Sequence, residues 1–280
     1  MKTSRILAMI LATIMTLMLF TGCEKTTNAS TEATATITGS PLMDSIIDAG
    51  VIKVGVGTGG APMGFTDDKG NPAGYDIDWA KKLAEALGVD VEFVIVNGET
   101  RIPALTSGRI DLMMCNTTGN VERAKTIDFT IPYVVTGLKV MVREDSEYYD
   151  LESMNKPECK IAINRGGTMD SLLDQYAPLA ERVYTTTFSE QLLLVEQGKA
   201  DATMEDATVI DYAASNSDGE LVSTVQYTSD PLCWGVRKGD LEFVRWLDMF
   251  ISWQITQGFQ KELYNKWWGC DPAVELKTLW

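Results

Sequence analysis

The sequence predicts an α/β fold of two similar lobes, each a mostly parallel sheet flanked by helices. Strand and helix patterns alternate along most of the chain, and the same order of elements occurs twice, in residues 51–114 and again in residues 160–206. Two segments at corresponding points are also alike, SGRIDLMMCN (107–116) and QGKADATMED (197–206). Alternating strands and helices favour parallel sheets covered by helices, because parallel strands need crossover connections.

The N-terminal segment has the features of a secretion signal that ends at a cysteine. Two basic residues precede an apolar run from Ile6 to Phe20, and Thr21-Gly22-Cys23 follows. This order is typical of a signal peptide that is cleaved before a lipidated cysteine. The run is too short for a membrane-spanning helix, which needs about 20 apolar residues. We therefore expect a signal peptide at residues 1–22 and a lipid attachment site at Cys23.

Residues 23–40 are predicted to be a flexible, lipid-anchored linker. They are rich in Thr, Ala and Ser and contain no aromatic residue, so they cannot bury a core. The residues that remain are enough for one large domain or two smaller ones.

The composition excludes several classes of function. The formal net charge is -15, and phosphate neutralisation needs clustered Lys and Arg, so a nucleic acid partner is not expected. The absence of histidine excludes His-dependent triads and imidazole metal sites. Beyond Cys23, no C-x-x-C spacing occurs, so we expect no metal; several disulfide pairings stay open. The cysteines concerned are Cys115, Cys159, Cys233 and Cys270.

The segment Gly55 to Gly60 fits the pattern G-x-G-x-x-G, but it does not indicate a dinucleotide cofactor. Such a site needs a helix directly after the glycines, and Ala61-Pro62 and further turn residues intervene here. No cofactor is expected. The glycines instead predict a wall with few side chains, where the backbone can approach a ligand closely.

The first series of elements follows from hydrophobic periodicity. Val51–Val56 is typical of a strand. Apolar residues recur on one helical face from Ile77 to Leu87, and Gly88 provides the stop. The remaining expected elements are a strand at Val91–Val96, a short helix from Arg101 that ends near Gly108, and a strand at Ile110–Met114.

The second series repeats this order. Its expected elements are a strand at Lys160–Asn164, a turn at Gly166-Gly167, helices at Thr168–Gln175 and Ser189–Gln197, and a strand at Ala200–Met204. When the two similar segments are laid together, Asn116 falls opposite Asp206. Each ends a predicted strand, and ligands of open α/β sheets bind at those ends.

The lobes are not simply consecutive in the sequence. We expect one strand to cross between them at residues 134–143 and the chain to return at about residues 221–235. The first lobe then comprises residues 41–138 and 225–280, and the second comprises residues 139–224. Two crossing strands form a hinge, which supports closure around a ligand.

Arg123 is a candidate for binding an anion. Its guanidinium presents a planar fork of donors that matches a carboxylate. Thr118 adds a neutral donor five residues earlier. The alternative is a surface arginine paired with Glu122 or Asp128.

The second lobe offers complementary groups. Gly166-Gly167-Thr168 leads into a helix and presents free N–H groups and a hydroxyl, which suits an anion. Asp206 is a candidate for binding an ammonium group. The alternative for Asp206 is a helix N-cap in front of Ala207.

Several motifs together resemble family 3 extracellular solute-binding proteins, the amino-acid receptors of ABC importers. The likeness extends from about Leu42 to Gly269. The motifs are GYDIDWAKKLAEAL (74–87), RIPAL (101–105), TTGNVERAKTIDFTIPY (117–133), the Gly-Gly-Thr turn, GKADATMED (198–206) and GFQKELYNKWW (258–268).

The resemblance implies a fold and a set of roles. The fold is that of type II periplasmic binding proteins. Arg123 would bind the α-carboxylate of a free L-amino acid with help from Thr118 and Thr168, and Asp206 would bind the α-ammonium, near Asn116. The protein would be a monomer that is lipid-anchored outside the cytoplasmic membrane and delivers its ligand to the permease and ATPase of an importer. It would not be an enzyme.

The ligand side chain is less defined by sequence. An arginine before Ile-Pro, here Arg101, resembles receptors for acidic and polar amino acids, where it faces a distal carboxylate. A second arginine of such receptors is missing, because Gly57 stands in its place. We therefore expect a polar or acidic amino acid, with glutamate or aspartate as the leading candidates. The alternative for Arg101 is a salt bridge between elements.

An enzyme is the competing interpretation. Some soluble dehydratases resemble this fold and place a carboxylic acid in the cleft. Glu205 is a spare acid near the strand ends, but alternation along the strand predicts that it points away from the face used by Asp206.

Overall fold

The computed structural model describes residues 39–279 of the chain. The expected signal peptide at residues 1–22, Cys23 and the linker as far as residue 38 lie outside the described residues. The described residues belong to one compact unit. None of the helices among them is long and apolar enough to cross a membrane.

The first sheet has the strand order β5-β1-β6-β15-β7. Strand β1 pairs in parallel with β5 and β6, and β15 is antiparallel to both of its neighbours. Four strands therefore come from the N-terminal half of the chain, whereas β15 returns from the C-terminal part. The strands are β1 (Val51–Val56), β5 (Asp90–Ile95), β6 (Leu112–Met113), β7 (Ile127–Phe129) and β15 (Gly235–Arg237).

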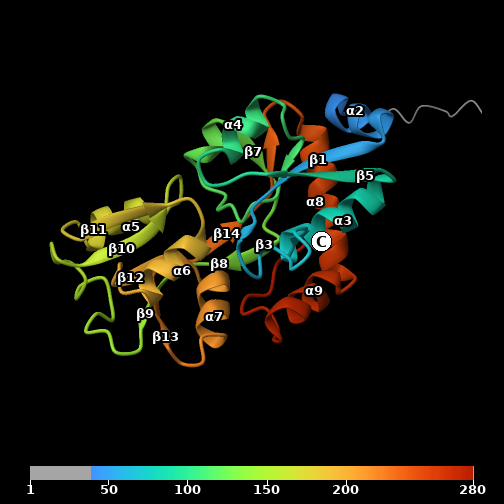
Figure 1. The fold of residues 1–280 in the computed structure, drawn as a ribbon. Coiled ribbons are helices and arrows are strands. Elements are labelled where there is room, and N and C mark those ends of the chain that lie inside the picture. Colours follow the sequence, from blue (N-terminus) through green and yellow to red (C-terminus); the bar gives the residue numbers. More distant parts are fainter. Residues whose placement is uncertain (1–38, 280) are drawn as a thin grey trace, which may run out of the picture. The chain divides into compact units, whose positions relative to one another are not determined.

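The second sheet has the order β11-β10-β12-β9-β13 and the same pattern of directions. Strand β10 is parallel to β11 and β12, and β9 is antiparallel to β12 and β13. The prediction of two similar, mostly parallel α/β lobes is therefore confirmed (Figure 1). The strands are β9 (Leu138–Arg143), β10 (Lys160–Asn164), β11 (Glu181–Thr185), β12 (Ala202–Asp206) and β13 (Leu221–Gln226).

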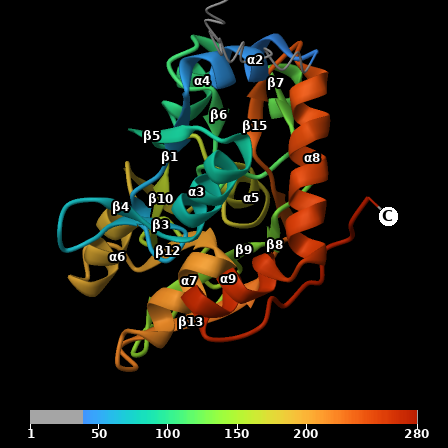
Figure 2. The same ribbon diagram turned by 90° about the vertical axis from the view of Figure 1, so that its right-hand side faces the viewer.

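Helices cover the faces of both sheets. Figure 2 shows α8 running along the first lobe beside β7 and β15. Helices of the first lobe are α2 (Pro41–Ala49), α3 (Tyr75–Leu87), α4 (Arg101–Thr106), α8 (Leu241–Thr256) and α9 (Phe259–Trp268), with a 3-10 turn at Arg123–Lys125. Helices of the second lobe are α5 (Met169–Tyr176), α6 (Phe188–Glu196) and α7 (Ala207–Ser215). A small sheet contains β2 (Gly59–Gly60), β3 (Gly64–Thr66) and β4 (Pro72–Ala73).

The similar ten-residue segments have the same structural role in both lobes. Asp111 accepts a hydrogen bond from the backbone N–H of Lys53 (3.0 Å), at the start of β1. Asp201 accepts one from the N–H of Lys160 (2.8 Å), at the start of β10. In each lobe the aspartate fixes the register of the strand that follows a helix against the first strand of its series. The likeness that predicted two lobes therefore has a physical basis.

The core of the first lobe is built around aromatic rings. Tyr75 and Trp79 on the inner face of α3 are fully buried, as are Tyr133 and Trp234. Tyr75 stacks on Tyr133 with centroids 5.9 Å apart, and Trp79 meets Trp234 edge-on at 5.4 Å. Each such pair contributes about 0.5–1.5 kcal/mol beyond the area it buries. This packing joins α3 to the segment that follows β7 and to the residue that precedes β15.

Two short strands connect the lobes. Strand β8 (Val134–Thr136) pairs antiparallel with β14 (Asp230–Leu232). One leads through Gly137 into β9 of the second sheet, and the other brings the chain back from β13. The two connections fall in the segments predicted to cross between the lobes. The predicted lobe boundaries at residues 138 and 225 stay predictions.

The structure differs from the predicted elements chiefly at their ends. The strand predicted at Ile110–Met114 is reduced to Leu112–Met113, whereas the one predicted at Ala200–Met204 begins at Ala202 and continues to Asp206. The backbone N–H groups of Lys199 and Ala200 both bond to Leu194 O, which extends the turn after α6. Strand β11 was not predicted, because its residues, ERVYT, show no clear alternation.

Gly74 provides a test of how α3 is positioned. Its φ of 128° is open to glycine only, and a Cβ here would lie 2.6 Å from Met63 O. We expect Gly74→Ala to lower the free energy of unfolding by about 2–4 kcal/mol in urea denaturation. Gly70→Ala is the matched control, because Gly70 also has a positive φ but has open space around it. The free energy of unfolding of Gly70→Ala should fall by only about 1 kcal/mol. Equal losses would contradict this account.

Candidate ligand-binding site

A cavity of about 400 Å³ lies at the carboxyl ends of the strands of both sheets. Open α/β sheets bind ligands at this edge. The cavity is lined by all seven residues that the sequence predicted to bind a ligand, so the fold brings them together. They are Arg101, Asn116, Thr118, Arg123, Gly167, Thr168 and Asp206.

Arg123 reaches the cavity from the 3-10 turn after β6. Its Nη1 donates to Thr118 O and its Nη2 donates to Gly166 O, both at 2.9 Å. Burial lowers the pKa of Arg123 to about 10, and the charge of Arg101 adds to this effect. The guanidinium is still protonated at neutral pH. A partly buried cation whose hydrogen-bond partners are backbone carbonyls is well suited to receive an anion.

The alternative role for Arg123, a surface ion pair, is not what the structure has. Glu122 forms an ion pair with Lys125. Asp128 forms one with Lys238 at 3.0 Å. Among the described residues, Arg123 therefore has no carboxylate partner within ion-pair distance.

Asp206 ends β12 and is 4% exposed. Its Oδ2 accepts a hydrogen bond from Asn116 Nδ2 at 2.7 Å, across the cavity. Asp206 Oδ1 and Asn116 Oδ1 are both buried and have no hydrogen-bond partner within residues 39–279. Burial raises the pKa of Asp206 well above its usual range, and the neighbouring charge of Glu205 raises it further. Two unsatisfied acceptors thus lie on a pair of side chains, one from each lobe, that bond to each other in the cavity wall.

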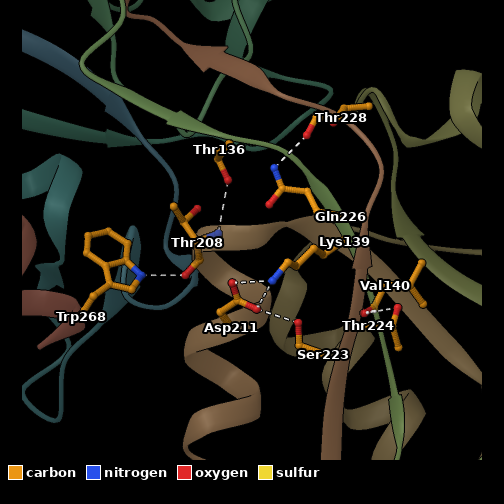
Figure 3. Close-up of polar contacts among 10 residues, drawn as sticks. All are labelled: Thr136, Lys139, Val140, Thr208, Asp211, Ser223, Thr224, Gln226, Thr228 and Trp268. Atoms are coloured by element: carbon orange, nitrogen blue, oxygen red, sulfur yellow. Dashed lines mark hydrogen bonds and ion pairs between the residues drawn. The ribbon is translucent and has the colours of Figure 1, made fainter. Parts of the chain in front are cut away.

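The carboxylate of Asp206 is not used to cap helix α7, because other groups form the cap. Asp206 occupies the N-cap position, but its side chain makes no capping bond. Ala207 N donates instead to Gly137 O (2.7 Å), and Thr208 N donates to Thr136 Oγ1 (3.3 Å; Figure 3). The connection between the lobes therefore satisfies the first N–H groups of the helix. The alternative that Asp206 acts as a side-chain cap is wrong.

The same turn of α7 is held from the other side by the first lobe. Trp268 Nε1, near the end of α9, donates to Thr208 O at 2.8 Å (Figure 3). The backbone N–H of Thr208 is thus bound by the connection between the lobes, and its carbonyl is bound by the first lobe. This anchors the backbone two residues beyond Asp206.

Arg101 is buried in the wall of the cavity. It does not form a salt bridge, which was the alternative predicted from the sequence. It is 7% exposed, and no carboxylate among the described residues lies within ion-pair distance of it. Nη2 donates to Gly166 O at 3.3 Å. Nη1 donates to Cys115 O (2.8 Å), Asn116 O (3.2 Å) and Thr117 Oγ1 (2.9 Å). Its terminal donors are therefore engaged with the protein.

The glycine turn of the second lobe borders the cavity as predicted. Gly166 has a φ of 75° and lies so close to Gly98 that an added Cβ would be 2.4 Å from Gly98 O. The hydroxyl of Thr168 makes no capping bond at the start of α5. Gly167 and Thr168 therefore present an N-terminal helix turn to the cavity, where anions are stabilised.

Glu205 corrects one prediction. The sequence predicted that it points away from the cavity, but both Glu205 and Asp206 line it. Oε2 of Glu205 accepts from Asn164 Nδ2 (2.7 Å), and Oε1 accepts from the backbone N–H of Asp206 (3.3 Å). Both residues lie at the C-terminal end of β12, next to the cavity. Because the cavity extends beyond the strand end, side chains from both faces reach it.

Asp76 was missed as a site residue. It is buried in the first turn of α3 and accepts from Tyr133 Oη (2.6 Å) and from Asn116 N (3.0 Å). Asn116 has a φ of 41°, so the carboxylate holds its backbone in a conformation that few residues adopt. Burial raises the pKa of Asp76 to about 6, although both hydrogen bonds oppose the shift. In the sequence, Asp76 cannot be distinguished from an acid that stabilises a helix N-terminus.

The lobes touch around the cavity. Ser189 Oγ in the second lobe donates to Gly59 O in the first at 3.2 Å. Gly98 and Gly166 are in close backbone contact, and Asn116 bonds to Asp206. The four described cysteines are all free, so no disulfide restricts the lobes within residues 39–279.

Two sheets of the same topology, with a polar cavity at their facing edges, define a two-lobed binding protein. The chain matches the model of the bacterial extracellular solute-binding proteins, family 3, over residues 52–270, and it belongs to this family.

Known relatives include binding proteins and an enzyme. The chain is 27% identical to the ABC transporter glutamine-binding protein of Bacillus subtilis, over 82% of this chain and 85% of that protein. It is 28% identical to a cyclohexadienyl dehydratase of Pseudomonas aeruginosa, over 59% of this chain and 62% of that protein. The crystal structure of an ancestral amino acid-binding protein, a precursor of cyclohexadienyl dehydratase, has 34% identity and a TM-score of 0.77, covering 80% of this chain and 98% of that one.

Asp206→Asn tests the electrostatics of the site without a ligand. Because burial raises the folded-state pKa of Asp206 above its unfolded value, the carboxylate destabilises the fold increasingly as pH rises through that interval. We expect Asp206→Asn to raise the free energy of unfolding at pH 7 by on the order of 1 kcal/mol. The gain should vanish below about pH 4, where the carboxyl is protonated in both states. Thermal unfolding from pH 4 to 8 measures this, and a destabilised variant at pH 7 would refute it.

Proposed function

We propose that this chain captures a free L-amino acid outside the cytoplasmic membrane and delivers it to the permease and ATPase of an ABC importer. The observation that carries the proposal is the charge pattern of the cavity. A cation without a carboxylate partner, Arg123, and two unsatisfied acceptor oxygens, on Asp206 and Asn116, line the same cavity. A zwitterion supplies the complement of each.

The proposed roles follow from these contacts. Arg123 binds the α-carboxylate with its fork of donors, and Thr118, Gly167 and Thr168 add neutral donors. The α-ammonium has three donors. It bonds to Oδ1 of Asp206 and of Asn116, the two acceptors that the protein leaves open.

Closure of the lobes is the second part of the proposal. Residues 41–138 and 225–280 form one moving body and residues 139–224 the other, with β8 and β14 as the hinge. Because Arg123 belongs to the first body and Asp206 to the second, one zwitterion contacts both. A ligand favours the closed state by its differential affinity for that state.

The glutamine-binding relative and the ancestral amino acid-binding protein support an amino acid as the ligand. Dehydration of a ligand is the second candidate function, because a dehydratase is among the relatives and the carboxyl group of Glu205 lines the cavity. Hydrogen-bond donors of the protein hold the carboxyl groups of both Glu205 and Asp206 in place. This favours a role in binding over a role in proton transfer.

Attachment to the membrane through a lipid on Cys23 completes the proposal. The protein would act as a monomer at the outer side of the cytoplasmic membrane, with residues 23–40 as its tether. The supporting observation is the basic, apolar and small-residue order of the first 23 residues.

Arg123→Lys tests the carboxylate assignment. Lysine keeps the charge but loses the planar fork, so calorimetry with the twenty amino acids should show affinity for the best ligand lowered by at least about 100-fold. Arg245→Lys is the matched control, because Arg245 is an exposed surface residue, and it should bind like the parent. A lysine variant within a few-fold of the parent would remove Arg123 from the site. NMR of the same mixtures would expose any dehydrated product, and turnover would favour the enzyme.

Cys23→Ser tests the anchor. We expect the parent in membrane fractions, with acyl chains on residue 23, and the variant either released or with its signal uncleaved. Mass spectrometry of the mature N-terminus measures this. A mature terminus elsewhere without acyl chains would disprove the anchor.

A further inference from the structure

A polar wall of the second lobe extends beyond Asp206 across neighbouring strand ends. Glu205 ends β12 together with Asp206, and Asn164 ends the adjacent β10; both line the cavity. Asn164 Nδ2 donates to Glu205 Oε2 at 2.7 Å, and Asn164 Oδ1 accepts from Thr185 Oγ1, at the end of β11, at 3.3 Å. The three side chains form one hydrogen-bonded row, so Asn164 fixes the carboxylate of Glu205 in place.

This row is rich in acceptors. An ionised carboxylate only accepts hydrogen bonds and has about four lone-pair sites. Glu205 receives one bond on each oxygen, from Asn164 and from the N–H of Asp206. Acceptor capacity therefore remains on a side chain that is only 8% exposed. Both oxygens are thus paired, and each can still accept a further hydrogen bond from a donor in the cavity.

The terminal nitrogens of Arg101 do not supply that donor, although Arg101 Nε is a buried donor without a hydrogen-bond partner among the described residues. Both terminal nitrogens of Arg101 donate to backbone carbonyls or to Thr117. Arg109 and Arg165 line the cavity but are exposed, and the guanidinium of Arg165 lies over the ring of Tyr184 at 4.0 Å. An acidic ligand side chain beside Glu205 would then place a second buried anion next to two carboxylates.

Three glycines of the first lobe form another part of the cavity wall. Gly57, Gly59 and Gly60 line it and carry none themselves. A Cβ on Gly57 would come within 3.1 Å of Cys115 Sγ, and one on Gly59 would be 2.5 Å from Thr187. Gly57 and Gly59 are therefore packed closely against these neighbours, and a side chain at either position would displace them.

We propose that Glu205, held by Asn164, is a specificity-determining residue that accepts a hydrogen bond from the ligand side chain. The ligand is then an amino acid whose side chain ends in N–H donors, a carboxamide, guanidinium or ammonium, and not a second carboxylate. This inference rests on the proposed function and narrows the polar or acidic amino acid expected from sequence.

Calorimetry on the mature chain tests the inference with glutamine and asparagine in one arm, arginine and lysine in a second, and glutamate and aspartate in a third. We expect a donor arm to bind at least about tenfold more tightly than the acidic arm. Tighter binding of the first arm assigns a carboxamide, and tighter binding of the second a cation; either upholds the inference. Glutamate or aspartate as the tightest ligand overturns it.

Glu205→Gln identifies the residue responsible. Glutamine keeps the shape and can still accept from Asn164, but it replaces acceptor capacity with a donor. The preference for the donor arm over the acidic arm should fall by at least about tenfold. Glu152→Gln, a change at an exposed residue, should leave it unchanged. An unchanged preference in Glu205→Gln overturns the inference alone. If no amino acid binds the parent chain, the proposed function itself fails, and this inference fails with it.

Discussion

The first turn of α7 is bonded to the connection between the lobes, and the character of the cavity depends on this. Most helices that begin with aspartate use its carboxylate to cap the first N–H groups. Here Gly137 O and Thr136 Oγ1 accept the hydrogen bonds of these N–H groups, so the carboxylate of Asp206 makes no capping bond. A buried carboxylate with one unsatisfied oxygen destabilises the protein. It is retained in position because Thr208 is bound from both sides, by the connection and by Trp268.

The duplicated lobes explain why the two halves of the site face each other. Asp111 and Asp201 fix equivalent strands by the same hydrogen bond, so the strand ends of the two sheets have similar geometry. Asn116 and Asp206 then occur at equivalent places and meet across the cavity at 2.7 Å. The pairing of an amide with an acid, rather than of two acids, keeps one charge at this point and leaves one acceptor on each residue.

The sequence predicted what depends on local pattern. The element order, the two lobes and the seven cavity residues came from periodicity, from the repeated segments, and from residue types matched to known motifs. The positions of Glu205, Asp76 and Arg101 depend on tertiary context. Alternation places Glu205 correctly on its strand, but it cannot tell that the strand ends at the cavity. Asp76 looks like any acid in a first helical turn, and its bonds to Tyr133 and Asn116 join residues far apart in the chain. The hydrogen bonds of Arg101 to backbone carbonyls also join distant segments and cannot be predicted from sequence.

The cavity arginines show what a ligand would add to the closed arrangement. Arg101 and Arg123 both donate to a single carbonyl, Gly166 O, at 3.3 and 2.9 Å, so two like charges converge on one uncharged acceptor. Their mutual repulsion contributes to the lowered pKa of Arg123. On the other side of the cavity, Glu205 and Asp206 are adjacent and each raises the cost of ionising the other. Contact between the lobes therefore places the two arginines of the first lobe and the two acids of the second lobe at the same cavity. A zwitterion would relieve both at once, because it places an anion at the arginines and a cation at the acids. Because the arginines and the acids belong to different lobes, a zwitterion bound to both would favour contact between the lobes, in line with the proposed closure.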